Sequence, residues 1–321
     1  MAEIDIQIMD PAAVSLPLSV QNLAFMNRTV YPSLLYPDTA KWTDEEFSIL
    51  DTVMNNWIFQ GVKNSMDDSP LYDFESIRIV QVRRSDTAGL LIPLEKSILQ
   101  KLKNVSKADA IISLEYYFIK DSVRMWSDYE LGYHEAYLGL NTITLWRIYD
   151  LNNNTILDEI ALNETTDWFR DDETLIGAAS KLPQAVDGIR QAAYNVGVTY
   201  GLRISPTWKE TQRFFYSSGG IEMRRAAGKI NSGDWYGAAE LWRKLAYGEH
   251  QKTAARACFN MALFCEMEDQ LILALDWAVK AYTIKQDKLT KEYIDLLKQR
   301  YSDGRRLKKQ LPSNSEFLLD I

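Results

Sequence analysis

The stretch NMALFCEMEDQLILALDWA, from Asn260 to Ala278, lies in a periodic region that decides the fold of the second part of the chain. Three alanines recur in this region with a shift of 35 residues: Ala227, Ala239 and Ala246 in the first copy, and Ala262, Ala274 and Ala281 in the second. Small residues at a constant spacing let two helices approach closely, while larger neighbours fill the space beside them. We therefore predict two helix pairs, at about residues 221–250 and 254–285, and a cap helix at 287–301.

The chain has two cysteines, Cys258 and Cys265, which fall on one predicted helix. Seven residues of helix rise about 10.5 Å, which exceeds the limit of roughly 7 Å between the Cα atoms of a disulfide. The two histidines, His134 and His250, are remote in sequence, so the cysteines lack the further ligands that a zinc site needs. We expect buried, unreactive thiols and no metal or cofactor.

Ahead of the helical region, the chain alternates between β-prone and helical segments. The β-prone runs are Ile4–Met9, Val20–Asn27, Ile77–Val82, Ala108–Asp121, Thr142–Asp150 and Thr155–Leu162. Asparagines at 152–154 predict a hairpin turn between the last two runs. Thr43 and Glu46 have capping-box spacing before one helix, and a long helix bent near Pro183 is predicted at Glu173–Tyr200.

This order of segments predicts an α+β fold with two domains. We place a mixed α/β sheet domain at residues 1–206, an all-α domain of helical hairpins at 207–311 and a C-terminal tail at 312–321. The boundary falls where the β-prone runs stop, near Ile204.

The helical region resembles the tetratricopeptide-repeat (TPR) family over about 65 residues, from Ile221 to Lys285. Asn260-Met261-Ala262 stands where that family usually has Asn-Leu-Gly, and Gly233-Asp234-Trp235-Tyr236 forms the turn within the first pair. The sequence departs from the family pattern at Met223, where a tryptophan is usual, and at Gln286, where a closing proline is usual.

In TPR proteins the first helix of each pair lines a concave groove. The corresponding positions here are Arg224, Gly228, Asn231, Arg256, Phe259, Leu263 and Glu266. The resemblance implies that this groove binds a protein or peptide partner, with the arginines pairing with carboxylates. The alternative interpretation is that the helices only brace the front domain.

The front domain is similar to the α/β domains of envelope proteins of the TolB amino-terminal and curli-secretion type. The similarity rests on NLAFMNR (22–28), ADAIISL (108–114) and ITLWRIYDLNNNTILDE (143–159), followed by a long helix. Joined to a TPR pair, the chain resembles an uncharacterised family of Gram-negative envelope lipoproteins, and IMDPAAVSLP (8–17) resembles that family's mature start. The resemblance implies an outer-membrane lipoprotein on the periplasmic side, its lipid anchor absent from this chain; a cytoplasmic location is the alternative.

Charge is divided unevenly along the chain. The whole chain has a net charge of −8. Residues 207–311, however, carry 19 Lys and Arg against 13 Asp and Glu, which is a net charge of +6. The first 206 residues are therefore strongly acidic, which argues against nucleic-acid binding, since phosphate contacts need clustered Lys and Arg. No apolar run approaches the roughly 20 residues of a membrane-spanning helix.

The sequence lacks the spacings of common catalytic motifs, so we predict a non-enzymatic binding or scaffolding protein. The alternative is an enzyme with an acidic site between the two domains, carried by residues such as Asp109, Glu115 and Asp121. Four aromatic residues are also crowded within twelve positions: Trp126, Tyr129, Tyr133 and Tyr137. Such a cluster indicates either a recognition surface or sheet packing.

Overall fold

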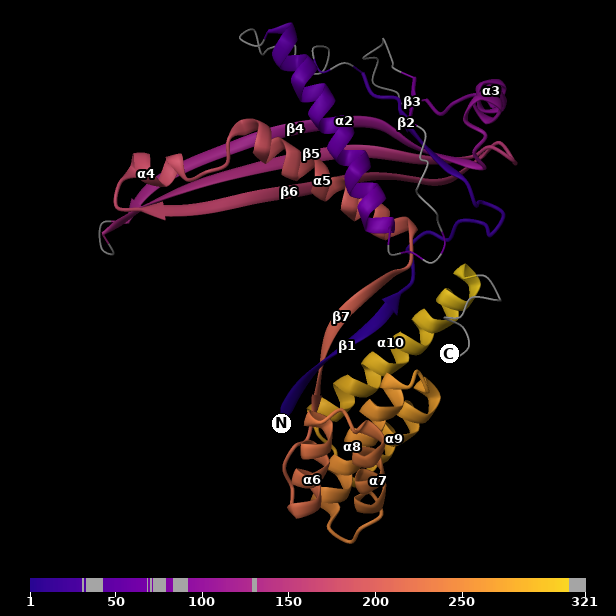
Figure 1. Ribbon diagram of the computed structural model, residues 1–321, viewed down its shortest axis with the longest axis vertical. Coiled ribbons are helices and arrows are strands. Elements are labelled where there is room, and N and C mark those ends of the chain that lie inside the picture. Colours follow the sequence, from indigo (N-terminus) through magenta and orange to yellow (C-terminus); the bar gives the residue numbers. More distant parts are fainter. Residues whose placement is uncertain are drawn as a thin grey trace. The chain divides into compact units, whose positions relative to one another are not determined.

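The computed structural model describes residues 1–30, 32, 43–67, 69, 71, 79–82, 92–128 and 132–311 (Figure 1). The chain forms two compact units, one of Ala12–Thr207 and one that joins Met1–Pro11 to Trp208–Ile321. We call them the sheet unit and the helical unit. The tail predicted at 312–321 lies outside the described residues.

Among the described residues, the sheet unit is built on five strands in the order β3-β2-β4-β5-β6. The strands are β2 (Leu23–Asn27), β3 (Ile79–Gln81), β4 (Ala110–Asp128), β5 (Tyr133–Asp150) and β6 (Thr155–Asp172). Strand β2 pairs in parallel with β3 and β4, whereas β4, β5 and β6 pair antiparallel. The predicted hairpin turn is confirmed at Leu151–Asn154, where Asn154 takes a φ of 54°.

Helices cover both faces of the inner half of this sheet (Figure 1). They are α2 (Asp44–Met66), α3 (Lys96–Ser106) and α5 (Ala185–Ile204), whereas α4 (Leu175–Ser180) lies at the outer end of the long strands. The predicted capping box of Thr43 and Glu46 is confirmed at the start of α2. In place of one bent helix at 173–200, the chain breaks between α4 and α5, because Pro183 has no N–H to donate within a helix.

The α2–α5 pair approaches closely because glycines stand at the crossing. A Cβ at Gly197 would lie 2.0 Å from the carbonyl oxygen of Ile58, and one at Gly61 would lie 2.1 Å from that of Tyr194. This pair buries one side of the sheet, with Trp146 stacked on Tyr200 at a ring-centroid distance of 4.2 Å. Helix α3 packs on the other side, over a smaller core.

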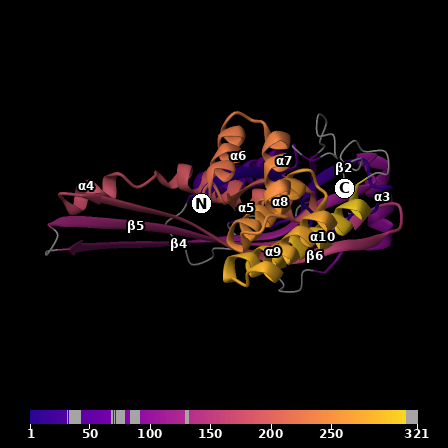
Figure 2. The same cartoon turned by 90° about the horizontal axis from the view of Figure 1, so that it is seen from below.

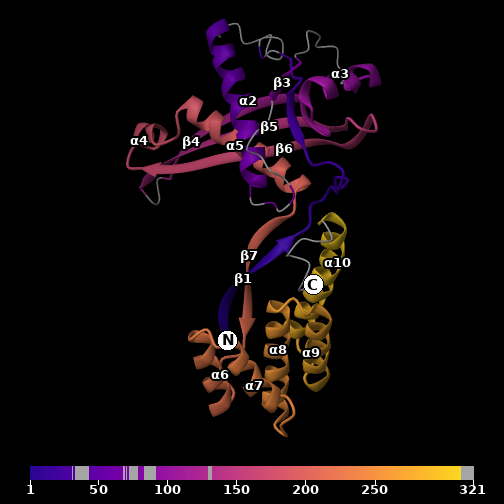
Figure 3. The same ribbon diagram turned by 45° about the vertical axis from the view of Figure 1, so that its right-hand side comes forward.

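Within its described residues, the helical unit contains five helices and the two strands of a small sheet (Figure 3). They are β1 (Ala2–Asp10), β7 (Thr207–Phe215), α6 (Ile221–Asn231), α7 (Trp235–Leu245), α8 (Gln251–Met267), α9 (Leu271–Ile284) and α10 (Lys288–Gln310). A mixed sheet domain followed by a helical region was predicted, and this coarse order is confirmed. The predicted cap helix at 287–301 continues to Gln310.

Two details of the predicted division were wrong. The sequence assigned the first residues to the sheet domain, but β1 pairs with β7 and belongs to the helical unit. The β-prone runs also continue past Ile204, since TWKETQRFF forms β7. Both errors have one cause: each strand finds its partner about 200 residues away, and a local pattern does not report such a pairing.

The cysteines are buried as predicted. Cys258 and Cys265 are free thiols within the core of the helical unit, and burial raises the pKa of each to about 11. Within the described part of the chain, no helix is long and apolar enough to cross a membrane.

Candidate functional site

The groove positions predicted from the first helix pair remain at the surface. Arg224 and Asn231 on α6 are exposed. Arg256, at the start of α8, is half-buried instead: its Nη1 donates to the carbonyl oxygen of Ser218 at 2.9 Å, and its guanidinium lies 5.1 Å from the ring centre of Tyr216. The three residues therefore do not share one open binding surface.

The remaining groove positions predicted from the second pair are buried, so their assignment to an open groove was wrong. Phe259, Leu263 and Glu266 are at most 3% exposed. The ring of Phe259 lies 5.3 Å from that of Tyr216, which follows β7, and 4.9 Å from that of Tyr293 on α10. The chain itself covers this face of α8.

The residues after β7 are bound to α8 in the manner of an extended peptide. The Asn260 side-chain amide accepts a hydrogen bond from the Tyr216 backbone N–H at 2.8 Å and donates one to the Tyr216 carbonyl oxygen at 2.9 Å. Asn260 is completely buried. The Asn260 side chain thus satisfies the N–H and the carbonyl group of Tyr216. Tyr216 belongs to the segment that lies where a peptide ligand was expected.

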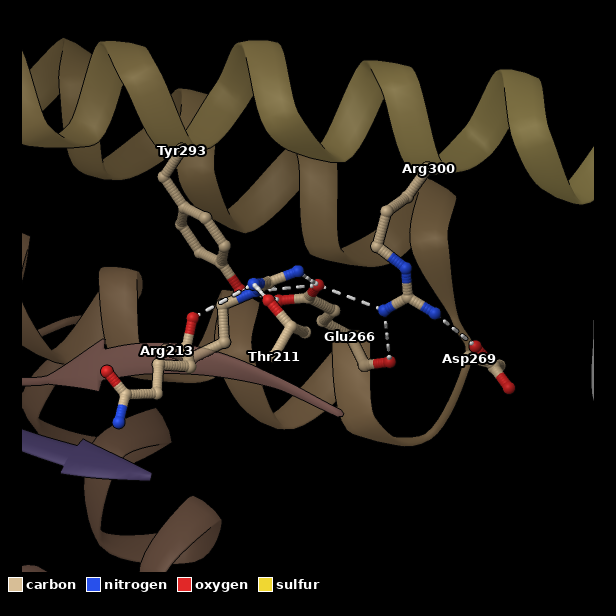
Figure 4. A network of polar contacts seen from close by, with 7 residues as sticks. Thr211, Arg213, Glu266, Asp269, Tyr293 and Arg300 are labelled. Atoms are coloured by element: carbon tan, nitrogen blue, oxygen red, sulfur yellow. Dashed lines mark hydrogen bonds and ion pairs between the residues drawn. The ribbon is translucent and has the colours of Figure 1, made fainter. Parts of the chain in front are cut away.

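Glu266 is the centre of a buried polar network that joins β7, α8 and α10 (Figure 4). Arg213 on β7 binds its carboxylate through Nε and Nη2 at 2.9–3.1 Å, and Arg300 on α10 binds it through Nη1 at 2.9 Å. The Tyr293 hydroxyl donates to it at 2.6 Å, and Arg300 also binds Asp269 at 3.0 Å. Burial, together with the Glu266 charge, holds the pKa of Tyr293 well above its usual range.

This network is structural, because its charges are satisfied by one another inside the unit. Two guanidinium groups face two carboxylates, and the Nη1 of Arg213 also donates to Thr211 at 3.0 Å (Figure 4). The sequence pattern predicted that Glu266 lies on the first helix of the second pair, but it predicted no charged partner for its carboxylate. Its partners lie 53 and 34 residues away, on elements whose packing the repeat pattern does not specify.

The acidic residues of the alternative enzyme hypothesis do not converge. Asp109, just before β4, accepts hydrogen bonds from the backbone N–H groups of Gln21 and Asn22; burial alone would raise its pKa, but these bonds lower it. Asp121, on β4, is exposed. It lies twelve residues beyond Asp109, which is a distance of roughly 40 Å at 3.3 Å per residue of strand.

Glu115, the third of these acids, is buried in a separate network. It forms ion pairs with Arg28 and Arg147 and accepts a hydrogen bond from the Tyr149 hydroxyl at 2.8 Å. Burial and the Glu115 charge raise the pKa of Tyr149 to about 12. These bonds join β2, β4 and β5, so they explain Glu115 as a structural residue.

The outer halves of β4, β5 and β6 extend beyond the rest of the sheet (Figure 2). We call residues 119–128, 133–141 and 163–172 the arm. Strand β2 pairs with β4 only as far as Leu114, so the arm has three strands. Along β6, odd-numbered residues from 159 to 171 are exposed and even-numbered residues from 160 to 168 are half-buried, as expected for a sheet with one covered face. Arg170, near the end of the strand, is exposed.

The face of the arm that carries these exposed residues, the open face, has a hollow of about 490 Å³. It is lined by Arg124, Trp126, Tyr137, Asp167 and Phe169. Arg124, Tyr137 and Phe169 form one row across the three strands, and the rings of the latter two lie 4.8 Å apart. The hollow therefore combines three aromatic rings with one cation and one anion.

Gly139 gives this hollow its shape. A Cβ at Gly139 would lie 2.3 Å from the Tyr137 hydroxyl oxygen and 2.8 Å from the ring carbon that bears it. The Tyr137 ring consequently lies along the strand, over a position that has no side chain. Helix α5 covers the opposite face of the sheet at this level. A Cβ at Gly188 on α5 would lie 3.3 Å from the Leu140 side chain.

The aromatic cluster noted in the sequence thus contributes part of the hollow. Trp126 and Tyr137 line it, whereas Tyr129 lies outside the described residues. Phe169 and Asp167 escaped the sequence argument because they belong to β6, and only the strand register brings Phe169 opposite Tyr137 and Asp167 opposite Gly139. Among the residues that the structure describes, no group of His, Cys, Asp or Glu side chains could hold a metal ion.

The comparisons with known proteins follow this division of the chain. A family model described as Domain of unknown function (DUF8603) matches residues 20–216. The chain belongs to this family. A second model, described as Domain of unknown function (DUF6340), matches residues 224–299, within the helical unit. No curated protein matches the chain.

Two solved structures that match the chain show remote likeness to it. The PelC dodecamer from Paraburkholderia phytofirmans is 11% identical, with a TM-score of 0.27, and the match covers 64% of this chain and 99% of that one. The hypothetical protein CT253 from Chlamydia trachomatis is 12% identical, with a TM-score of 0.22, over 55% of this chain and 96% of that one.

Proposed function

We propose that this protein is a non-enzymatic scaffold that binds a partner protein through the hollow on the open face of the arm. The observation that carries the proposal is the exposure of aromatic side chains there: Trp126 is 38% exposed and Phe169 is 59% exposed. Buried aromatic and arginine side chains contribute most to protein–protein affinity, and these side chains present that chemistry to solvent.

The chemistry of the hollow suits a protein partner. Its volume of about 490 Å³ accommodates one or two side chains of a docked protein. Trp126 and Phe169 supply rigid apolar area at a low cost in conformational entropy. Arg124 and Asp167 orient the partner, because each side chain pairs favourably only with a group of opposite charge or with a matching hydrogen-bonding group.

In this proposal the helical unit is TPR-like and does not capture a peptide. The helix pairs α6–α7 and α8–α9 support this assignment, since Ala262 and Ala274 are fully buried where α8 meets α9. The segment after β7 occupies the face of α8 that a TPR protein offers to a peptide. We therefore propose that this face of α8 does not capture a peptide, whereas Arg224 and Asn231 stay exposed.

We further propose, on the sequence resemblance alone, that the protein acts in the Gram-negative cell envelope. Metabolic labelling with a radioactive fatty acid tests this when the complete native gene is expressed. Label incorporated into the protein, together with its recovery in outer-membrane fractions, supports the location. An unlabelled protein recovered in the cytoplasmic fraction contradicts it.

Site-specific photo-crosslinking tests the binding surface. A photo-reactive phenylalanine analogue replaces Trp126 in one variant and Val105 in a matched control, in cells that produce the protein natively. Val105 on α3 is apolar and 68% exposed, but it lies away from the hollow. We expect a discrete crosslinked product from position 126 only, lost when Phe169→Ala is added. Absence of any product at 126, or the same product at 105, would refute the proposal.

A further inference from the structure

A second hollow lies within the helical unit, where the start of α9 meets the second half of α10. Its volume is about 470 Å³, and we call it the α9–α10 groove. Its lining includes Leu271, Ile272, Leu273, Tyr301, Gly304 and Arg305. The groove is distinct from the face of α8 that the segment after β7 covers.

The groove exposes apolar side chains to solvent. Ile272 is 64% exposed, Leu273 is 43% exposed and Tyr301 is 40% exposed. Gly304, which also lines the groove, contributes no side chain to fill it. Neighbouring apolar side chains that are exposed to this degree mark a surface that binds another segment.

The charged residues of the groove favour an acidic occupant. Arg305 and Lys308 line the groove from α10, and both are exposed. Two aspartates also line it, but Arg300 binds Asp269 at 3.0 Å, so the carboxylate charge that remains is that of Asp276 alone. A segment that combines apolar and acidic side chains therefore suits the groove better than a basic one.

Residues 312–321, which follow α10 in the sequence, have this combination. They read PSNSEFLLDI, so three apolar residues at 317–319 stand between Glu316 and Asp320. The apolar residues match the exposed side chains of the groove, and the two acids match its cations.

The end of α10 allows the chain to turn back toward the groove. Leu311 has an extended backbone, with φ of −91° and ψ of 144°, and Pro312 has no N–H with which to continue a helix. Gly304 lies six residues before Gln310, or about 9 Å back along the helix axis. Six residues of extended chain, from Leu311 to Phe317, span up to about 20 Å. Phe317 is therefore within reach of the groove.

Attachment to α10 favours this segment over a separate occupant. A segment on a short linker acts at an effective concentration of about millimolar, so it can occupy a site for which its intrinsic affinity is weak. A separate peptide of the same kind has to reach a comparable concentration to compete with it.

We propose that the α9–α10 groove binds residues 312–321 of the same chain. The apolar residues at 317–319 lie against Ile272 and Tyr301, and the acids lie beside Arg305 and Lys308. The segment shields the apolar side chains of the groove, so a partner can bind there only by displacing it. This inference does not depend on the proposed role of the hollow on the arm.

Photo-crosslinking within the purified full chain tests this contact. A photo-reactive phenylalanine analogue replaces Phe317 in one variant and Ile221 in a control; Ile221, at the start of α6, is 73% exposed. After illumination we expect a product of monomer mass in which position 317 is joined to the peptide that contains Ile272 or the one that contains Tyr301, as identified by mass spectrometry. Position 221 should give no such product.

Charge reversal tests which side chains hold the segment. Arg305→Glu with Lys308→Glu should lower the yield of the product about fivefold, because two attractions between exposed groups become repulsions. Adding Glu316→Lys and Asp320→Lys to the same chain restores opposite charges, so the yield should return to near its original level. This recovery separates a lost contact from a lost fold, because a misfolded chain would not regain it.

A matched control carries Lys291→Glu and Lys298→Glu, two exposed positions of α10 outside the groove. It changes the net charge equally and should leave the yield unaltered. Absence of a crosslink from position 317 to either helix would overturn the proposal and leave the groove to a separate partner. A product of twice the monomer mass would overturn it in favour of the segment of a second copy, and an unchanged yield after charge reversal would also contradict it.

Discussion

Glu266→Gln is the sharpest test of how the helical unit is held together. The substitution preserves the shape of the side chain but removes the charge that faces Arg213 and Arg300, both of which lie largely out of solvent. Breaking a buried ion pair by neutralising one partner costs about 3–5 kcal/mol, because the remaining charge stays uncompensated. For a unit of this size the loss corresponds to a fall of about 12–20 °C in its unfolding transition.

Differential scanning calorimetry of the full chain can follow the two units separately if they unfold in separate transitions. We expect the transition of the helical unit to fall and that of the sheet unit to remain. Asp269→Asn is the matched control: Asp269 also binds Arg300, but its side chain is 41% exposed, so the expected loss is below about 1 kcal/mol. A fall of less than about 4 °C for Glu266→Gln would show that the network does not stabilise the unit as reasoned.

Three further predictions concern separate parts of the molecule. Gly197→Ala should destabilise the sheet unit by several kcal/mol in urea unfolding, because its Cβ would meet the backbone of α2 at 2.0 Å; an unchanged midpoint would contradict the close helix crossing. Cys258 and Cys265 should resist a thiol reagent at pH 8 until the chain unfolds, since both pKa values lie near 11; rapid labelling of the native protein would show that one is accessible. The pKa of Asp109 is lowered from its ordinary value of 3.8, so its stabilising contribution is present above that pH and is lost as the pH falls through the folded-state pKa. Asp109→Asn should therefore flatten the loss of stability below about pH 4 in acid unfolding, and an unaltered acid limb would argue against these hydrogen bonds.

Local features of the fold were predictable because their causes are local. The capping box of Thr43 and Glu46 and the turn at 151–154 each depend on residues within a few positions of one another. The helix pairs were predictable for a related reason: the periodic alanines report contact between consecutive helices, and Ala274 is indeed fully buried.

The candidate site was less predictable because it depends on distant pairings. Trp126 and Tyr137 drew attention in the sequence, but Phe169 joined them only through the register of β5 and β6. Glu266 illustrates the reverse case. Its position on the first helix of a pair suggested a groove, yet Arg213 and Arg300 arrive from elsewhere and bury it.

The pairing of β1 with β7 has a consequence for synthesis of the protein. The sheet unit is inserted between the first strand of the helical unit and the rest of it, so Ala2–Asp10 emerges from the ribosome nearly 200 residues before Thr207–Phe215. At about 5–20 residues per second, β1 waits on the order of 10–40 s for its partner. During that interval the sheet unit can fold first and bring its two ends together, so that the earliest strand of the chain is among the last to be secured.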